Sequence, residues 1–543
     1  MTTYNVLSLE FSKDLRSLKQ SLPSVKSGKI PVGLRNSILH KMRWFRVVLD
    51  EAHIIKDTNT MQSKAACSLS ADRKWCLTGT PIQNKLDDLY SLVNFLGVEP
   101  FCSKLSWNNY ITKGMKLRAP GGGSIGVARL QTLMKSITLR RTKYSKIRGK
   151  SIISLPPRFD TIKTITLDDT EQILYDRASA QAQKVFQGFE MEGSVLRHYV
   201  HLLELILKLR QICTHPLLCK NYEELLKQEE ETWNSDRAGH LLGLLKDTGD
   251  ESCCSCGCYV DGIEFTPHIS KCAHLFCDNC AKSVQGNACP MCQTALNKGD
   301  ILIVNEGDEE DKKMDASIAL QKLNTGGQSV ASSKVTALME DLTKIKEENA
   351  KSGEAPIKSV IFSQWTQMLD LIEKPILQAG IKLVKLDGRM NRNERTVSLE
   401  RFKKDHSVTV ILISLKAGGV GLNLTTASRV YIMEPYWNPA IEQQAIDRVH
   451  RLGQTRNVYT TRFIAAGTIE DNIIELQKKK TELTQVTFKE GENVDLANFD
   501  HRKARIRRAD LKKDKEALQK EKLADLRMLF SIQSAKKEEV KKE

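Results

Sequence analysis

The chain has 543 residues, enough for about three or four domains of ordinary size, and 41% of them are hydrophobic. It contains no run of about 18 apolar residues, which argues against a membrane-spanning helix, and its N-terminus lacks the apolar core of a signal peptide. The net charge of +16 favours a polyanionic partner, although charge alone is weak evidence. Nine of the 14 cysteines lie between Cys253 and Cys292, which indicates metal binding rather than disulfides.

The order of apolar and polar stretches predicts several successive parts. Residues 1–145 alternate short apolar runs with helical stretches, as an α/β domain does, and residues 155–250 are expected to be mostly helical. The Cys-rich segment follows, and then a polar stretch over residues 305–333 that indicates a linker. The α/β alternation returns over residues 333–485, with strands expected in SVIFS, LVKLDG, VTVILISL and RVYIM, and a charged tail follows that we expect to be helical.

The first chemical signal is RVVLDEAH, an apolar strand that ends in two acids, Asp50 and Glu51. Carboxylates at the carboxyl edge of a parallel sheet lie where such folds bind ligands. Asp50 would hold the magnesium shell of a nucleotide, and Glu51 would polarise the attacking water. An acidic pair on a solvated loop has no such meaning, so the interpretation depends on the other motifs.

Three further motifs strengthen it. WCLTGTPIQN, from Trp75 to Asn84, is a second apolar strand that ends in a hydroxyl- and glycine-rich turn, and SLKAGGVGLNL begins at Ser414. In QAIDRVHRLGQ, Arg448 and Arg451 are three residues apart, which would place both on one side of a helix within reach of a γ-phosphate. Two arginines at this spacing usually form a solvated face, but four motifs in this order make that reading improbable.

These motifs resemble the SWI/SNF branch of superfamily-two helicases, whose members hydrolyse ATP between two RecA-like lobes while tracking along double-stranded DNA. Within that branch the chain is similar to the RING-bearing helicase-like transcription factor group, which includes a yeast post-replication-repair relative. The resemblance implies an α/β fold of two RecA-like lobes, the first incomplete, with a helical insertion and a zinc-bound RING module between them. The matching blocks are TTYNVL, LDEAH, LTGTPIQN, VIFSQW, LDGRM, SLKAGGVGLNLTTA and EPYWNPAIEQQAIDRVHRLGQTR, together with LRRTKYSKIRGK and LRQICTHPLL.

The resemblance also assigns roles to individual residues, with ATP and Mg²⁺ as cofactors. Asp50 and Glu51 would be the magnesium-binding and water-activating acids, and His53 would couple the nucleotide state to the neighbouring motif. The second lobe would complete the ATP site with Gly418, Gly421, Gln444, Arg448 and Arg451. Residues in blocks that lie near the DNA backbone in this family are Thr2, Thr3, Asn84, Ser363, Gln364, Thr425 and Trp437.

One expected motif is missing. The chain contains no G-x-x-x-x-G-K-[ST] phosphate loop, and the nearest match, RGKS at Arg148 to Ser151, has Tyr144 in place of the first glycine. Because the chain begins within TTYNVL, which we expect to be a strand, the pattern favours a truncated gene model or fragment. We therefore expect an open apolar edge on the first lobe, and almost no ATPase activity from this chain alone.

The Cys-rich segment has the ligand order of a RING cross-brace that binds two Zn²⁺ ions. The extra thiols Cys254 and Cys258 leave the first ligand pair open, although Cys253 and Cys256 fit best. Cys253, Cys256, Cys277 and Cys280 would bind one ion, and Cys272, His274, Cys289 and Cys292 the other.

A RING module recruits a ubiquitin-conjugating enzyme through an apolar residue between its first two cysteines and a proline beside the last pair. Pro290 is present, but Ser255 is polar, so zinc binding is a firmer prediction than ubiquitin ligation. Ile263, Phe265 or Ile269 could supply the apolar contact instead.

The expected domains are a first-lobe part (1–150), a helical insertion (151–250), the RING (251–295), a linker (296–332), the second lobe (333–490) and a basic tail (491–543). The leading hypothesis is a nuclear DNA translocase that remodels chromatin or stalled forks in repair, coupled to ubiquitin ligation. Its partners would be double-stranded DNA, a ubiquitin-conjugating enzyme, and chromatin or a replication clamp. The alternatives are an ATPase-deficient, DNA-binding ligase scaffold and a regulatory or non-functional truncated product.

Overall fold

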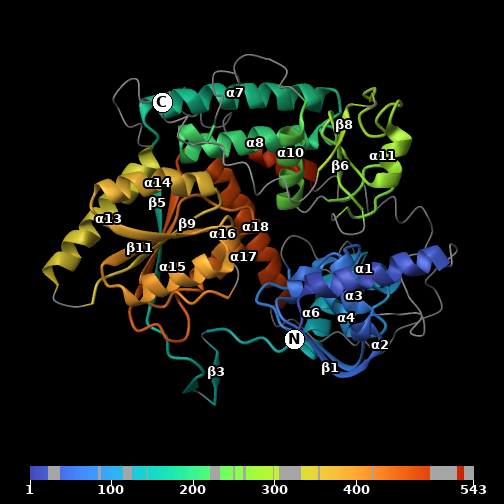
Figure 1. Ribbon diagram of the computed structural model, residues 1–543, viewed down its shortest axis with the longest axis horizontal. Coiled ribbons are helices and arrows are strands. Elements are labelled where there is room, and N and C mark those ends of the chain that lie inside the picture. Colours follow the sequence, from blue (N-terminus) through green and yellow to red (C-terminus); the bar gives the residue numbers. More distant parts are fainter. Residues whose placement is uncertain are drawn as a thin grey trace. The chain divides into compact units, whose positions relative to one another are not determined.

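The computed structural model shows two compact units (Figure 1), each of which is described by itself. Unit 1 comprises residues 1–139, 231–311 and 482–518, and unit 2 comprises residues 140–230, 312–481 and 519–543. The structure describes residues 1–21, 37–82, 87–113, 125–143, 145–148, 150–219, 233–248, 251–260, 265–297, 299–304, 332–352, 355–418, 421–488 and 522–530.

The centre of unit 2 is a six-stranded parallel sheet in the order β10-β11-β9-β12-β13-β5. All five residues of β9 are buried, as expected for a central strand covered on both faces. The strand that follows β9 in sequence, β10, lies on one side of it, and the strand that follows β12, β13, lies on the other side, so β9 and β12 form the topological switch point where such sheets bind ligands. The strands are β5 (Arg158–Ile165), β9 (Ser359–Ser363), β10 (Lys382–Leu386), β11 (Val408–Ser414), β12 (Arg429–Ile432) and β13 (Val458–Ala465).

Alternating side chains of this sheet divide its core between two layers of helices. Ile361 of β9 packs in the cluster formed with α13 and α14, whereas Val360 and Phe362 pack in the cluster formed with α15 and α17 (Figure 1). Capping side chains set the start of two helices, since Ser332 accepts from Val335 N–H in α13 and Asn391 forms a capping box with Glu394 in α15. The helices are α13 (Ser333–Lys351), α14 (Thr366–Gln378), α15 (Arg392–Lys404), α16 (Leu415–Gly418) and α17 (Pro439–Ile446).

A second core of unit 2 is helical. The long helices α7 and α8 pack with α18 and with a helical segment at residues 522–530. Phe530 of that segment stacks on Phe186 of α7 at 4.7 Å, and Asn472 of α18 donates to Leu529 O at 2.9 Å. The elements are α7 (Asp169–Met191), α8 (Tyr199–Thr214), η5 (Pro216–Leu218), α18 (Ile469–Phe488) and the short hairpin β3 (Lys146–Ile147) and β4 (Lys150–Ser151).

The first part of unit 1 has two parallel strands, β1 (Arg43–Leu49) and β2 (Ser70–Cys76). One face packs against helices, with Leu7, Phe11 and Leu15 of α1 buried at a four-residue spacing. Phe45 and Val48 of β1, Trp75 of β2 and the following Leu77 are between 48% and 62% exposed, which agrees with the expected open apolar edge. The helices are α1 (Tyr4–Ser21), α2 (Ile38–Lys41), η2 (Ala52–Ile55), α3 (Met61–Cys67), α4 (Asp87–Leu96), α5 (Lys104–Trp107), η3 (Asn108–Thr112) and α6 (Ile125–Ile137).

The Cys-rich part of unit 1 has a small antiparallel sheet in the order β7-β6-β8, against which α10 packs. Its elements are α10 (Ser235–Thr248), β6 (His268–Ser270), β7 (Leu275–Phe276), α11 (Asp278–Val284) and β8 (Ile301–Ile303).

The structure confirms the predicted α/β class with a parallel sheet, including the four strands expected after residue 333. The described helices include none with the length and apolarity needed to cross a bilayer. The expected strand at TTYNVL is wrong, because Thr3 accepts the Val6 N–H at 3.2 Å and helix α1 begins at Tyr4.

The buried ion pair between Lys334 and Glu470 provides a test of the unit 2 core. Both side chains are 0% exposed, and Lys334 Nζ lies 2.7 Å from the carboxylate. Lys334→Met leaves Glu470 charged and unmatched, so we expect unfolding free energy to fall by about 3–5 kcal/mol in urea titrations. The control Lys404→Met removes an exposed pair with Glu400 and should cost less than about 1 kcal/mol. Equal losses for the two variants would contradict this account.

Candidate functional site

The predicted acids Asp50 and Glu51 follow directly after β1, at the carboxyl edge of its sheet. Glu51 has left-handed backbone angles (φ 49°, ψ 49°), an uncommon conformation for a residue with a side chain. Its N–H donates to Asp50 Oδ1 at 3.0 Å, and its own side chain is 40% exposed. Both carboxylates are therefore accessible to a cation and to water.

His53 links this motif to the next one. Its Nδ1 lies 3.4 Å from Thr78 Oγ1 and 3.4 Å from Glu51 Oε2. Burial lowers the pKa of His53, against the opposing effect of Glu51. Leu77 N–H donates to Leu49 O at 2.8 Å, which ties the ends of the two strands together. The motifs LDEAH and LTGTP are thus one connected structure, as the predicted coupling role of His53 requires.

The second-lobe motifs after β11 and after α17 are also joined. Arg451 Nη1 donates to Leu422 O at 3.2 Å, and Leu424 N–H donates to Arg448 O at 3.1 Å. Gly418 is the last residue of α16, and Gly421 has φ +55°, which favours glycine. The structure therefore brings the glycine motif and the arginine motif together at one edge of unit 2.

The arginines do not share a helix, so that expectation is wrong. Helix α17, which carries Gln444, ends at Ile446, and Arg448 and Arg451 lie in the turns that follow. The buried Gln454 side chain donates to Val449 O and to Ala427 O, and these bonds hold the chain in turns rather than helix. The three-residue spacing of Arg448 and Arg451 therefore does not place them on one face of a helix, as was expected from the sequence.

A lysine that the sequence did not single out supports the arginine turn. Lys143 Nζ lies 2.6 Å from Asp447 Oδ1 and 2.5 Å from His450 O, on either side of Arg448. Arg158 also approaches Asp447, at 3.9 Å. Lys143 lies in the segment that precedes β5, and Arg158 is the first residue of β5. They are 304 and 289 positions from Asp447 in the sequence, so no local pattern could indicate the contacts.

Of the predicted DNA-facing residues of unit 2, Ser363 and Gln364 lie at the end of β9, at the switch point of the sheet, and Ser363 is 0% exposed. Ser363 Oγ donates to Glu434 Oε1 at 2.9 Å, and Gln364 N–H donates to the same oxygen. Thr425 Oγ1 donates to Asn423 Oδ1 at 3.0 Å in the glycine motif. Of the remaining members, Thr2 and Thr3 are exposed before α1, whereas Asn84 lies outside the described residues.

Trp437 is held by a buried cation from the helical insertion. The guanidinium of Arg210, on α8, lies 4.8 Å from the Trp437 ring centroid and 5.5 Å from that of Trp365. Arg210 is 1% exposed and donates to Pro435 O at 2.6 Å. The insertion thus fixes both tryptophans beside Gln364, a link that the sequence motifs did not reveal.

Glu434 is a buried carboxyl that motif matching missed. It is 0% exposed, and burial raises its pKa to about 7, while Gln364 N–H, Lys334, Ser363 and Arg210 act in the opposite direction. Its Oε2 has no hydrogen-bond partner among the described residues. The motif EPYW therefore carries a titratable group directly beneath Ser363 and Gln364.

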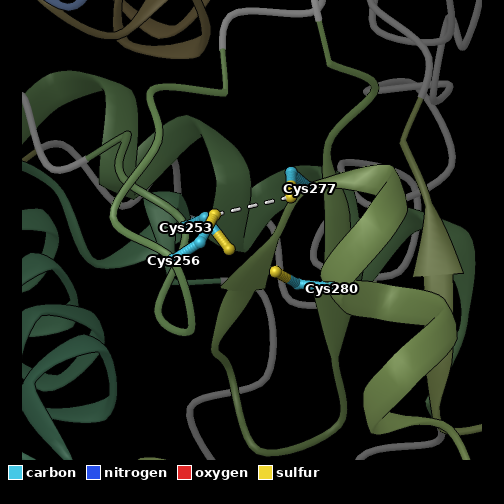
Figure 2. A group of neighbouring side chains, drawn as sticks. All are labelled: Cys253, Cys256, Cys277 and Cys280. Atoms are coloured by element: carbon cyan, nitrogen blue, oxygen red, sulfur yellow. Dashed lines mark hydrogen bonds between the residues drawn. The ribbon is translucent and has the colours of Figure 1, made fainter. Parts of the chain in front are cut away.

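The described residues contain two sets of metal-ligand side chains, and they are the two predicted sets. Within each set the ligand atoms all lie within 4.8 Å of one another: Cys253, Cys256, Cys277 and Cys280, and Cys272, His274, Cys289 and Cys292. Figure 2 shows the four thiols of the first set gathered around one point, with Cys280 on helix α11.

The spacing within the sets fits zinc. A tetrahedral site with zinc–sulfur bonds of about 2.3 Å has sulfur–sulfur edges of about 3.8 Å. Cys256 Sγ and Cys277 Sγ are 3.8 Å apart. In the second set, His274 Nδ1 lies 3.3 Å, 3.6 Å and 3.7 Å from the sulfurs of Cys272, Cys289 and Cys292. Both donor sets therefore have the size and chemistry that Zn²⁺ prefers.

Comparison with known families identifies two domains in this chain. The SNF2-related domain matches residues 1–218, and the helicase conserved C-terminal domain matches residues 334–453. The chain therefore carries both domains of an SNF2-related protein. The human protein "Helicase-like transcription factor" is 39% identical over 464 residues, which are 83% of this chain and 44% of that protein. "DNA repair protein RAD5A" of Arabidopsis thaliana is 35% identical over 506 residues, 88% of this chain and 45% of that protein.

This SNF2-related chain thus spans less than half the length of these two relatives. Among solved structures, "Sulfolobus solfataricus SWI2/SNF2 ATPase core in complex with dsDNA" matches with a TM-score of 0.34 and 23% identity. That match covers 83% of this chain and 71% of the solved one.

The raised pKa of Glu434 predicts a pH-dependent stability. The pKa is higher in the folded chain (about 7) than in the unfolded chain (4.5), so the contribution of Glu434 is fully present below pH 4.5 and is lost as pH rises through 7. Glu434→Gln keeps an acceptor for Ser363 and Gln364, and should match wild type at pH 4.5 but exceed its stability at pH 8 by on the order of 3 kcal/mol. Urea unfolding at both pH values measures this, with the exposed Glu400→Gln as control. An equal difference at both pH values would contradict it.

Proposed function

We propose that this chain is the motor part of a nuclear ATP-driven translocase that moves along double-stranded DNA during repair, remodelling chromatin or stalled forks. The main support is that each unit carries one group of chemically suitable residues: Asp50 and Glu51 directly after β1 in unit 1, and Arg448 and Arg451, hydrogen-bonded to the glycine motif, in unit 2. Acids for water and metal in one domain and arginines for phosphate in another are what two-lobe ATP hydrolysis requires. The relatives named for DNA repair add support.

Each residue would have a defined task in ATP hydrolysis. Asp50 would orient the shell of a Mg²⁺ ion, which neutralises phosphate charge when bound. Glu51 would accept a hydrogen bond from the attacking water and polarise it. Arg448 and Arg451 would stabilise charge that develops on the γ-phosphate. His53 would transmit the state of Glu51 to Thr78, since it lies within 3.4 Å of both side chains.

DNA would be bound through its backbone. The net charge of +16 and the partly exposed side chains of Gln364 and Thr425 favour phosphate contacts that carry no sequence information. Ser363 is 0% exposed and donates to Glu434, so it would position Gln364 rather than touch DNA. Trp437, fixed by Arg210, would supply a rigid surface next to them. This predicts similar affinity for unrelated duplexes and steep weakening with salt.

The motor proposal is tested with a chimera. Because the sequence has no phosphate loop, we compare the chain alone with the chain joined to the phosphate-loop segment of helicase-like transcription factor. Only the chimera should show DNA-stimulated phosphate release, and Glu51→Gln in it should lower the rate at least about 100-fold, because the general base is lost. Glu10→Gln is the control. An unchanged rate in the Glu51→Gln chimera would contradict the assignment, as would robust turnover by the chain alone.

We further propose that the two donor sets hold structural Zn²⁺ ions in a RING-type module that recruits a ubiquitin-conjugating enzyme. The order of the ligands along the chain alternates between the two sets, which is the cross-brace pattern. Ser255 and Pro290 are exposed, and Phe265 is half-buried, so all three are available to a partner. Ile269 is 0% exposed, so its suggested role in the contact is wrong, and Ile263 lies outside the described residues.

The ligase proposal predicts a gain of function. Ser255→Ile adds apolar area worth roughly 1.5–3 kcal/mol on burial, so ubiquitin transfer should strengthen about ten- to a hundredfold at limiting conjugating enzyme. Pro290→Ala should weaken it, and Ser352→Ile, which adds the same side chain in unit 2, should leave it unchanged. If Ser255→Ile has no effect while Pro290→Ala abolishes transfer, the surface that binds the conjugating enzyme does not include position 255. Absence of transfer with every conjugating enzyme would leave the module a structural one.

A further inference from the structure

The first donor set has a fifth thiol beside it. Cys258 lies two residues beyond the ligand Cys256, its carbonyl accepts the N–H of the ligand Cys253 at 2.7 Å, and its thiol interacts with the thiols of Cys256 and Cys277. Those two sulfurs are 3.8 Å apart, one edge of the tetrahedron that a zinc ion needs. Cys258 therefore faces an edge of the site, where a sulfur can approach the metal without crossing another ligand.

The backbone explains how Cys258 arrives there. Cys253 N–H donates to Cys258 O at 2.7 Å, and Gly257 N–H donates to Cys253 O at 2.8 Å. Gly257 has φ +73°, which lets the chain reverse tightly. Beyond the turn, Ser252 and Tyr259 pair as an antiparallel bridge. The six residues from Cys253 to Cys258 thus form one closed turn whose last thiol returns to the site.

Of the two ligands near Cys258, Cys256 is held less firmly in the zinc site than Cys277. Cys277 is 1% exposed and is the N-cap of helix α11, so it is fixed at the base of the site. Cys256 is exposed and lies in the same turn as Cys258, one residue away from it on the other side of Gly257. Exchange of Cys256 for Cys258 requires only adjustment of this turn.

The other additional cysteine is a natural control. Cys254 N–H donates to Leu275 O at 2.9 Å, and its thiol interacts with Cys253 and with Cys289 and Cys292 of the second donor set. It adjoins Cys253 in sequence, but two of these partners are ligands of the other site. Proximity in the sequence alone would make the two extra cysteines equivalent, whereas the structure separates them.

We propose that the first zinc site of this chain has five thiol donors, with Cys258 able to replace Cys256 as the fourth ligand. The inference rests on the proposed zinc sites and goes beyond them, because a four-ligand cross-brace assigns Cys258 no role. The site would keep its ion when the exposed Cys256 is lost or modified.

Zinc content of the purified full chain under reducing conditions tests the proposal. Wild type and Cys256→Ser should each hold about two ions per chain, and the Cys256→Ser/Cys258→Ser double variant about one. Cys256→Ser/Cys254→Ser should keep about two, and Cys280→Ser should fall to about one, because Cys258 would replace Cys256 only. Loss of an ion from Cys256→Ser alone, equal to that of the double variant, would overturn the proposal. Loss from Cys258→Ser alone would also overturn it, because Cys258 would then be obligatory.

Cobalt substitution gives a second reading that does not depend on counting ions. In Co²⁺-loaded protein the visible bands report the number of thiolate ligands. Cys256→Ser should keep the wild-type spectrum of the four-thiolate site, whereas the double variant should lose it. Loss of the four-thiolate component in Cys256→Ser would overturn the proposal, since the second set contributes a three-thiolate component in every variant. A wild-type chain without zinc would instead refute the zinc sites themselves, so the two failures are distinguishable.

Discussion

The ion pair between Lys334 and Glu470 is the contact on which unit 2 depends. Lys334 Nζ donates to both carboxylate oxygens at 2.7 Å and to Met433 O at 3.0 Å, while Glu470 also accepts the Ala465 N–H at 2.8 Å. Removing two charges from water costs several kcal/mol per ion, and only well-formed contacts offset that cost. The pair therefore fixes α13, α18 and the ends of β12 and β13 in a single arrangement.

The candidate DNA surface of unit 2 is built on that arrangement. Glu434 follows Met433, whose carbonyl Lys334 binds, and Glu434 in turn holds Ser363 and Gln364. Arg210 adds the helical insertion to the same buried region through Pro435 O. Side chains that would meet a DNA backbone are thus positioned by charges that never reach solvent. A binding surface needs such support because its side chains must be held close to the geometry in which they contact the ligand.

Features encoded by residues close together in the sequence could be predicted, whereas contacts between residues far apart in the sequence could not. The central strands were predictable because β9 and β11 are continuous apolar runs, and the zinc ligands because their spacing is set within about forty residues. Strand β5 was not singled out, because an edge strand with four successive exposed residues has no apolar run. The partnerships of Lys334 with Glu470 and of Lys143 with Asp447 join residues 136 and 304 positions apart, and no local pattern encodes them. The helix expected at Arg448 failed for the same reason, since Gln454 ends it through tertiary bonds.

The edge strand β5 has a consequence for how this chain is made. Arg158 of β5 pairs with Val458 of β13, so the neighbours in the sheet are 300 residues apart. A ribosome adds about 5–20 residues per second, so β5 must wait roughly 15–60 s for its partner to emerge. During that interval the strand has an unpaired backbone edge that other strands could join. Its exposed polar side chains, including Asp160 and Thr161, make such pairing less favourable while synthesis continues.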